Sequence, residues 1–281
     1  MGEFELIDAF VRALPHAKSP RGPGDDAAVL GRLCVTTDAL VEGVHFRRPA
    51  FSLEDVGWKA LATNLSDLAA MGASPRWWLC ALGLPRGFSR GDALKLARGM
   101  RPLARRYGLM LAGGNVTRSP VLSVTLTVVG ETARPLLRSG AKAGDFVYVA
   151  GVLGEAADLR SRAQRRPVPL VEEGLLAARF ASAGIDVSDG LLQDLGHLLA
   201  ASGVGAELDS AALPARNLKR ALYGGEDYAL LLAVPARKAA ALERAWKGRV
   251  PLACIGAFTR KRALLLDGRA VKARGFDHLA P

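Results

Sequence analysis

The first half of the chain alternates between segments with helical spacing of apolar residues and short apolar segments typical of strands. One apolar stripe predicts a helix over 52–71, and its members are Trp58, Leu61, Leu65 and Leu68. A second helix is predicted over 89–107, and each of the two begins at a Ser followed three residues later by an Asp, a variant of the capping box. Strands are predicted over 33–36, 77–84 and 121–129, with a turn at 113–115.

The second half begins after a polar, glycine-containing stretch at 134–144, which marks a candidate domain boundary. Beyond it the pattern predicts strands at 146–150 and 228–234 and helices at 153–164, from Val171, at 190–201 and at 236–247, followed by a hairpin that turns at Asp267-Gly268. We therefore expect an α/β (α+β) protein with two domains, 1–135 and 136–281.

Composition and charge narrow the class of protein. The 281 residues are 50% hydrophobic and 23% charged, which is enough to bury a large core. The net charge of +11 raises the alternative of a nucleic-acid binder, but the arginines are dispersed and no aromatic residues interleave with them. No apolar run of about 18 residues and no signal-peptide pattern is present, so a cytoplasmic protein without a membrane segment is predicted.

Acidic residues recur beside Gly, Ser or Thr at the predicted turns and strand ends. They are Asp25, Asp26, Asp38, Asp67, Asp186, Asp189, Glu226 and Asp227. Taken singly, such an Asp is most often a turn residue or a helix N-cap. Taken together they could hold Mg²⁺, which prefers oxygen ligands and binds one or two carboxylates together with phosphates. No P-loop, HExxH, GxSxG or paired CxxC motif competes with this hypothesis of a metal–phosphate enzyme.

Nine motifs in one order carry a family resemblance. They are GEFELI, GPGDDAAVL, TTDALVEGVHF, KALATNLSDLAAMGA, GGNVTRSP, RSGAKAGD, IDVSDGLLQDLGHL, GGEDYALLL and GFDHLAP. The chain thus resembles the thiamine-monophosphate kinases, whose superfamily also contains aminoimidazole ribonucleotide synthetase and selenophosphate synthetase. The resemblance implies that ATP and Mg²⁺ are used to convert thiamine monophosphate to thiamine diphosphate in thiamine diphosphate biosynthesis, by direct in-line transfer. It also implies a two-domain homodimer in which the N-terminal sheets form a shared barrel.

The resemblance further implies roles for individual residues, none of them as a general acid or base. The implied metal ligands are Asp26, Thr36, Thr37, Asp38, Asp67, Asn115, Asp186 and Asp189. The implied ATP contacts are Tyr107, Gly114, Asn115, Arg138 and Ser188. The implied contacts to thiamine phosphate are His45, Glu226 and Phe276.

The chain departs from the family pattern in two motifs and in length. Asn115 stands where an Asp is often found, so one expected metal ligand is neutral, and Leu170 stands where a basic residue is expected. Some loops of the second half are short. Two alternatives stay open beside the kinase. One is an enzyme of the same superfamily that acts on a different acceptor, and the other is a non-catalytic nucleotide-binding homologue.

Overall fold

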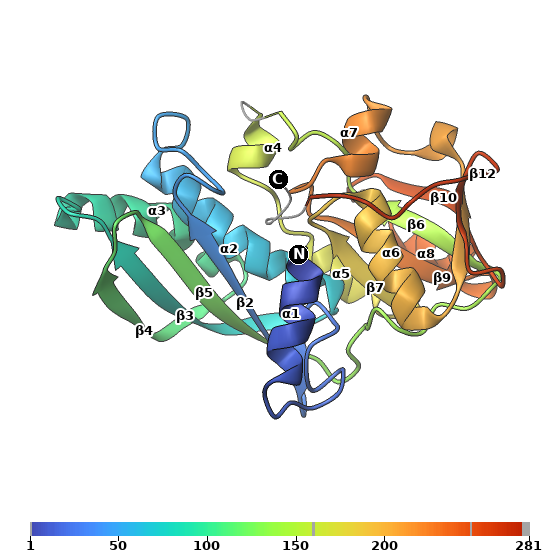
Figure 1. Cartoon of the computed structure of the whole chain (residues 1–281), viewed down its shortest axis with the longest axis horizontal. Coiled ribbons are helices and arrows are strands. Elements are labelled where there is room, and N and C mark those ends of the chain that lie inside the picture. The colour runs from blue at the N-terminus through green and yellow to red at the C-terminus, as the bar shows by residue number, and fades with distance from the viewer. Residues whose placement is uncertain (1, 159–160, 248, 277–281) are drawn as a thin grey trace.

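The computed structural model describes residues 2–158, 161–247 and 249–276, and it places two β-sheets side by side with a long helix between them (Figure 1). The first sheet has the order β1-β2-β5-β3-β4. Its strands are β1 (Ala28–Leu30), β2 (Leu33–Val41), β3 (Ser74–Leu84), β4 (Met110–Arg118) and β5 (Ser123–Glu131). Helices α2 (Leu53–Ala70) and α3 (Arg90–Arg106) cover one face of this sheet, and the other face is open (Figure 1).

Helix α2 is the central element of the fold. Ser52 accepts a hydrogen bond from the Asp55 amide, and the Asp55 side chain accepts one from the Ser52 amide, which confirms the predicted start of the helix. Gly72, with a φ of +60°, follows the end of the helix. The sequence predicts an amphipathic helix, but 14 of its 18 residues are buried. The reason is that α2 packs on β2, β5 and α3 on one side and on β7, β9 and α5 on the other. Both polar and apolar sides of α2 therefore lie inside the molecule.

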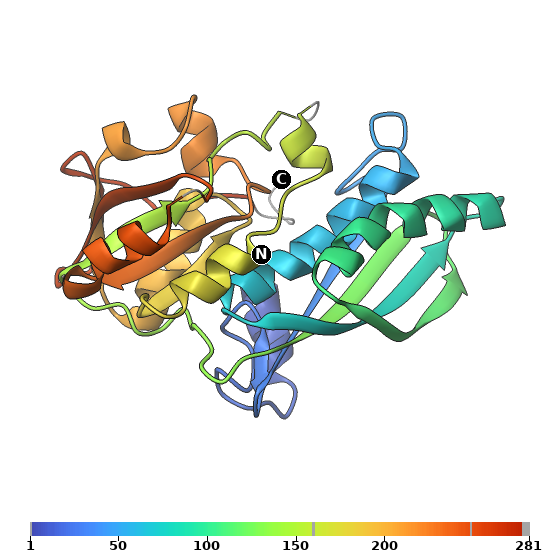
Figure 2. The ribbon, with the colours of Figure 1, turned by 180° about the vertical axis from the view of Figure 1, so that it is seen from behind.

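The second sheet has the order β12-β11-β8-β10-β6-β9-β7 and is antiparallel except for the pairing of β8 with β11. Its strands are β6 (Asp145–Ala150), β7 (Ala183–Val187), β8 (Gly205–Leu208), β9 (Ala229–Pro235), β10 (Leu252–Thr259), β11 (Leu264–Leu266) and β12 (Arg269–Ala270). Helices α6 (Leu191–Ser202) and α8 (Ala236–Ala245) lie on opposite faces of it, as the front and back views show (Figures 1 and 2).

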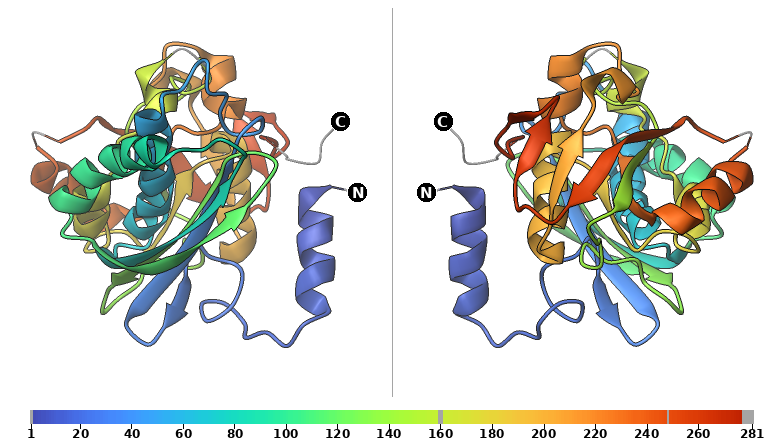
Figure 3. Two further views of the ribbon diagram at one scale, coloured as in Figure 1. Left: turned by 90° about the vertical axis from the view of Figure 1, so that its left-hand side faces the viewer. Right: turned by 90° about the vertical axis from the view of Figure 1, so that its right-hand side faces the viewer.

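The remaining helices are short or peripheral. They are α1 (Glu3–Arg12), α4 (Arg162–Arg165), α5 (Val171–Ala177), α7 (Leu218–Tyr223) and a single 3₁₀ turn at Ser210–Ala212. Helix α1 lies to one side of the two sheets, as the side views show (Figure 3). In the part of the chain that the structure describes, no helix is both long enough and apolar enough to cross a membrane.

Two predictions of local structure are wrong. Residues 113–115 lie inside β4 and do not form a turn, because β4 pairs with β3 along its whole length and a Cβ at Gly114 would come 1.9 Å from the carbonyl oxygen of Cys80. The helix predicted over 153–164 is reduced to the four residues of α4, and residues 159–160 of that prediction lie outside the described residues. Upstream of α4, the Asp227 carboxylate accepts hydrogen bonds from the amides of Gly154 at 2.6 Å and Ala156 at 3.1 Å. These amides are held in turns and not in a helix.

Candidate active site

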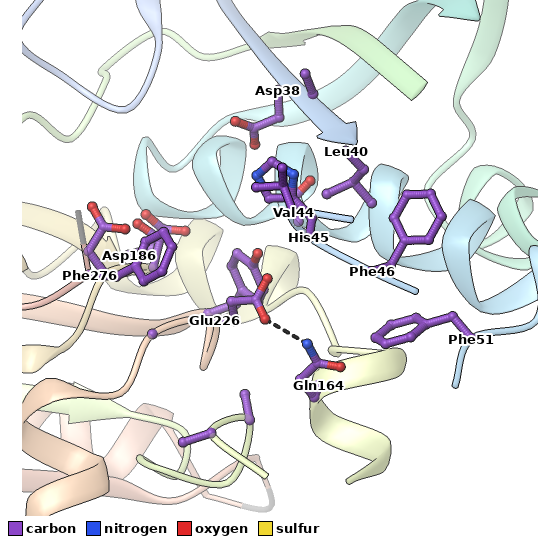
Figure 4. Close-up of a pocket in the computed structure, with 18 of the residues that line it drawn as sticks. Asp38, Leu40, Val44, His45, Phe46, Phe51, Gln164, Asp186, Glu226 and Phe276 are labelled. Carbon is purple, nitrogen blue, oxygen red and sulfur yellow. Dashed lines mark hydrogen bonds between the residues drawn. The ribbon is translucent and has the colours of Figure 1, made fainter. Parts of the chain in front are cut away.

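A cavity of about 710 Å³ lies between the two sheets. Its walls come from β2 and the loop after it, from α2, from the end of β7 and from the loop before β9. Asp38 and Asp186 lie toward one end of the cavity, whereas Phe46, Phe51 and Gln164 lie toward the other, with Glu226 between the two groups (Figure 4). The cavity thus has an acidic end and an end lined by aromatic and amide side chains.

Four carboxylates from four different elements converge at the acidic end. Asp26 comes from the loop before β1, Asp38 from β2, Asp67 from α2 and Asp186 from β7. Thr36, two residues before Asp38 on the same face of β2, donates a hydrogen bond to Asp67. Ser66 donates one to Asp186 at 2.6 Å. Small hydroxyl residues therefore orient carboxylates that are distant from them in the sequence.

The pKa values of these carboxyl groups are raised. Burial raises the pKa of Asp67 well above its usual range, and repulsion from Asp38, Asp186 and Asp26 adds to the effect. Burial, with the charge of Asp26, raises the pKa of Asp186 to about 8. Buried like charges are unfavourable unless a cation or a proton compensates them. The cluster is therefore suited to bind positive charge.

The donor atoms fit Mg²⁺. All are oxygens, and Asp26 Oδ2 is buried with no hydrogen-bond partner among the described residues. Within those residues, no three His, Cys, Asp or Glu side chains are grouped so that they would hold one ion by themselves. This arrangement is compatible with Mg²⁺, since that ion takes one or two protein carboxylates and fills its other positions with phosphate oxygens and water.

Arg138 is fixed against the acidic cluster. Its Nη2 and Nε both donate to Asp26 Oδ1, at 2.5 and 3.1 Å, and its backbone amide donates to Asp25 at 2.8 Å. The guanidinium is half of an ion pair in which the Asp26 carboxylate is 1% exposed and the Arg138 side chain is 24% exposed. Arg138 therefore holds a positive charge against the Asp26 carboxylate.

Glu226 is held from both halves of the fold. Lys59 Nζ, on α2, lies 2.5 Å from Glu226 Oε1, and Gln164 Nε2, on α4, donates to Glu226 Oε2 at 2.9 Å. The loop that carries Glu226 is strained, with φ values of +65° at Glu226 and +51° at Tyr228. Hydrogen bonds from these two amides to the carbonyls of Ser188 and Val187, at 2.7 and 2.8 Å, hold that conformation. Such strain is typical of functional loops.

Comparisons with known proteins identify the family of the chain. Residues 24–132 match the AIR synthase related protein N-terminal domain, and residues 142–265 match the C-terminal domain of the same family. A thiamine-monophosphate kinase of Salmonella typhimurium is 39% identical over 99% of this chain and 98% of its own. The chain belongs to the thiamine-monophosphate kinase family.

Two solved structures of the thiamine-monophosphate kinase family are close in fold. AaThiL complexed with AMPPCP and TMP has a TM-score of 0.88 and 31% identity, covering 99% of this chain and 97% of that one. The thiamine-monophosphate kinase of Stenotrophomonas maltophilia has a TM-score of 0.80 and 37% identity, covering 96% and 98%. The alignment with the Salmonella relative extends over 326 positions, so this 281-residue member contains gaps relative to it, in keeping with the expected short loops.

The structure brings most of the residues implied by the family resemblance to one place. Those that line the cavity are Asp38, His45, Asp67, Asp186, Ser188, Asp189, Glu226 and Phe276. Thr36 donates a hydrogen bond to Asp67 of this group, Asp26 interacts electrostatically with Asp67 and Asp186, and Arg138 interacts electrostatically with Asp186. Thr37 differs: its side chain lies on the opposite face of β2 and donates to the Leu126 carbonyl at 3.0 Å. Residues 277–281, which complete the last family motif, lie outside the described residues.

Three implied ATP contacts do not reach the cavity within one chain. Gly114 and Asn115 lie on β4, three strands from β2 and thus roughly 14 Å away at the usual strand spacing. All nine residues of β4 are exposed. Tyr107, at the end of α3, donates from its hydroxyl to the Pro169 carbonyl at 3.1 Å, and it is not among the described residues that line the cavity.

Phe46 and Phe51 of the cavity were not predicted from the sequence, and neither were the polar residues Lys59 and Gln164. Lys59 lies in the middle of α2 and its side chain is fully buried, and Gln164 is 3% exposed. A lysine among the apolar residues of a helix is a recognisable signal, because a buried lysine needs a partner. No comparable signal exists for Gln164, since its partner is distant in the sequence.

Proposed function

We propose that this protein transfers the γ-phosphoryl group of ATP to the phosphate of thiamine monophosphate, giving thiamine diphosphate and ADP. The observation that carries the proposal is the cavity itself, in which a cluster of carboxylates faces a pocket of aromatic side chains with Glu226 between them. Its ends suit the two parts of such an acceptor, one a phosphate and the other a pair of rings of which one is cationic. The relatives named as thiamine-monophosphate kinases support the same reaction.

Mg²⁺ is the proposed cofactor, held by Asp26, Asp38, Asp67, Asp186 and Asp189. Bound Mg²⁺ would neutralise phosphate charge and align the donor and acceptor phosphates. Arg138 supplies a fixed cation beside them, and Ser188 offers a hydroxyl at the cavity wall. Phosphoryl transfer depends on positioning and charge neutralisation more than on proton transfer, so we assign no general acid or base and infer direct in-line transfer.

The acceptor rings are proposed to lie at the far end of the cavity. Phe46 and Phe51 are buried there with ring centroids 6.3 Å apart, and Phe276 lies near the acidic end, 51% exposed. His45 also faces the cavity, and its Nδ1 accepts a hydrogen bond from the Val41 amide at 3.1 Å, which fixes the imidazole. Together with Glu226, these groups offer flat apolar surfaces and a negative charge to a cationic heteroaromatic ring.

A homodimer is proposed on the open face of the first sheet. This face and its edge strand expose Trp77, Leu79, Met110, Leu111 and Val116, each by more than 40%. An uncovered apolar face and an unpaired edge strand are features that proteins normally cover. A shared barrel formed by two copies would cover both, and it would allow Gly114, Asn115 and Tyr107 to serve the ATP site of the assembly. We place the domain boundary at 135/136, between β5 and β6, and the protein in the cytoplasm.

The test is to incubate the purified protein with ATP, Mg²⁺ and thiamine monophosphate and to separate the products by chromatography. The proposal predicts thiamine diphosphate and ADP in equal amounts, and loss of both when Mg²⁺ is chelated. Turnover of free thiamine alone would contradict the proposed acceptor. Turnover of an aminoimidazole-type substrate without thiamine monophosphate turnover would favour a superfamily enzyme with a different acceptor.

A further inference from the structure

Gln164 occupies an unusual position in the cavity wall. Its Nε2 donates to Glu226 Oε2 at 2.9 Å (Figure 4), while Lys59 Nζ lies 2.5 Å from the other oxygen of the same carboxylate. Since a carboxylate accepts and does not donate, this contact fixes which end of the amide carries the oxygen. The Gln164 amide therefore has its Nε2 toward Glu226 and its Oε1 turned away from it.

The Oε1 atom of Gln164 is buried and has no hydrogen-bond partner among the described residues. A buried acceptor without a partner costs about 1–3 kcal/mol, and most buried polar atoms in proteins are satisfied. The atom belongs to a residue that is 3% exposed and that lines the cavity. An acceptor of this kind is suited to a donor that arrives with a ligand.

The segment that carries Gln164 is held rigidly. The Gln164 amide is capped by Ser161 Oγ at 3.0 Å, Arg166 pairs with Asp55, and Trp58 Nε1 donates to the Pro167 carbonyl at 2.6 Å. Asp55 and Trp58 both lie on α2, so the residues that follow Gln164 are attached to the other half of the fold. A side chain on such a support can discriminate between ligands, because the backbone that carries it is held in place.

We propose that Gln164 is a specificity-determining residue for the acceptor and that its Oε1 accepts a hydrogen bond from the exocyclic amino group of the aminopyrimidine ring. The inference rests on the proposed function. With the acceptor phosphate at the carboxylates, the rings extend toward Phe51 and Gln164 at the other end (Figure 4). The last torsion of a glutamine side chain is soft, so a small rotation of the amide uncovers Oε1 for the incoming amino group.

The test compares two acceptors, thiamine monophosphate and oxythiamine monophosphate, in which an oxygen replaces the amino group. The wild-type protein should prefer the amino compound in kcat/KM by about 10- to 100-fold, the range expected for one buried hydrogen bond. Gln164→Leu should lose this preference to within about threefold, mainly through a higher KM for thiamine monophosphate, with the KM for ATP unchanged. Gln164→Met makes the same test if the Leu variant does not fold.

Ser161→Ala is the matched control, since it removes the cap on the Gln164 backbone N–H but leaves the Gln164 side-chain amide in place. It should keep the preference for the amino compound. The inference is overturned if Gln164→Leu and Gln164→Met keep the wild-type preference. An equal loss of kcat/KM for both acceptors, as expected for Ser161→Ala, is one form of that result. A wild-type protein that forms no thiamine diphosphate overturns the proposed function and this inference together, so the two failures are distinguishable.

Discussion

The pair formed by Lys59 and Glu226 gives the most specific prediction for stability. The Lys59 side chain is fully buried, whereas that of Glu226 is 30% exposed at the cavity. Burial lowers the pKa of Lys59, and the Glu226 carboxylate opposes that shift. Lys59 therefore depends on Glu226 more than Glu226 depends on Lys59, and removing Glu226 should lower the free energy of unfolding more than removing Lys59.

Glu226→Gln leaves a buried ammonium group without its counter-charge and should lower the free energy of unfolding by about 3–5 kcal/mol. Lys59→Met leaves a carboxylate that water and Gln164 can still solvate, and it should cost only about 2 kcal/mol. The double variant Lys59→Met/Glu226→Gln removes both charges, so it should be more stable than the sum of the single changes by at least about 2 kcal/mol.

Urea unfolding of all four proteins at one pH, without ATP or Mg²⁺, measures these differences. Glu54→Gln is the control, because its pair with Arg98 has side chains that are 30% and 50% exposed and should contribute no more than about 1 kcal/mol. If Glu226→Gln costs no more than Lys59→Met, or if the two single changes add without coupling, the buried ammonium group of Lys59 does not depend on Glu226 in this way.

Three further predictions concern the acidic cluster and the open face. Asp67→Asn should reduce kcat at least about 100-fold at ordinary Mg²⁺, with partial recovery at higher Mg²⁺, and a near-normal kcat would contradict the assigned role. Because the pKa of Asp186 is raised to about 8, the folded protein without Mg²⁺ keeps this carboxyl protonated at pH values where the unfolded chain ionises it. The contribution of Asp186 to the free energy of unfolding is therefore fully present below pH 3.8 and is lost as the pH rises to about 8, by at most about 1.4 kcal/mol per pH unit. Asp186→Asn should flatten this slope in unfolding curves measured across pH, and an unchanged slope would show that Asp186 is not its source. Trp77→Glu, at a side chain 46% exposed on the open face, should shift sedimentation toward the monomer, whereas an unchanged mass would contradict the proposed dimer face.

Local signals predicted much of the fold. The helix starts at Ser52 and Ser89 were predicted because a capping box depends only on residues three apart, and the structure confirms both. The hairpin at Asp267-Gly268 is confirmed for the same reason, with φ values of +51° and +75°. Where nearby residues determine the backbone conformation, the sequence pattern was sufficient to predict the local structure.

The errors come from partners that are distant in the sequence. Gly113 to Asn115 indicated a turn, but pairing with β3 makes this segment a strand. Gly154 was expected in a helix, yet its amide is held by Asp227, 73 residues away. Such contacts are set by the tertiary fold, which overrides local preference.

The candidate site shows the same division. The Asp residues were visible because each lies beside Gly, Ser or Thr within its motif, and the family resemblance supplied their roles. Lys59 and Gln164 were not predicted as site residues, because both depend on Glu226, which lies 167 and 62 residues away. Their importance follows only from the way in which α2 and α4 approach the loop before β9.

We propose that this protein moves the terminal phosphoryl group of ATP directly onto thiamine monophosphate. The most direct test is a single-turnover reaction with ATP labelled at the γ-phosphorus, Mg²⁺ and thiamine monophosphate, followed by separation of nucleotides, thiamine phosphates and protein. We predict that the label appears in thiamine diphosphate, in amounts equal to the ADP formed, and that none remains on the protein. Label released as inorganic phosphate, retained on the protein, or absent from thiamine diphosphate would contradict direct transfer to thiamine monophosphate.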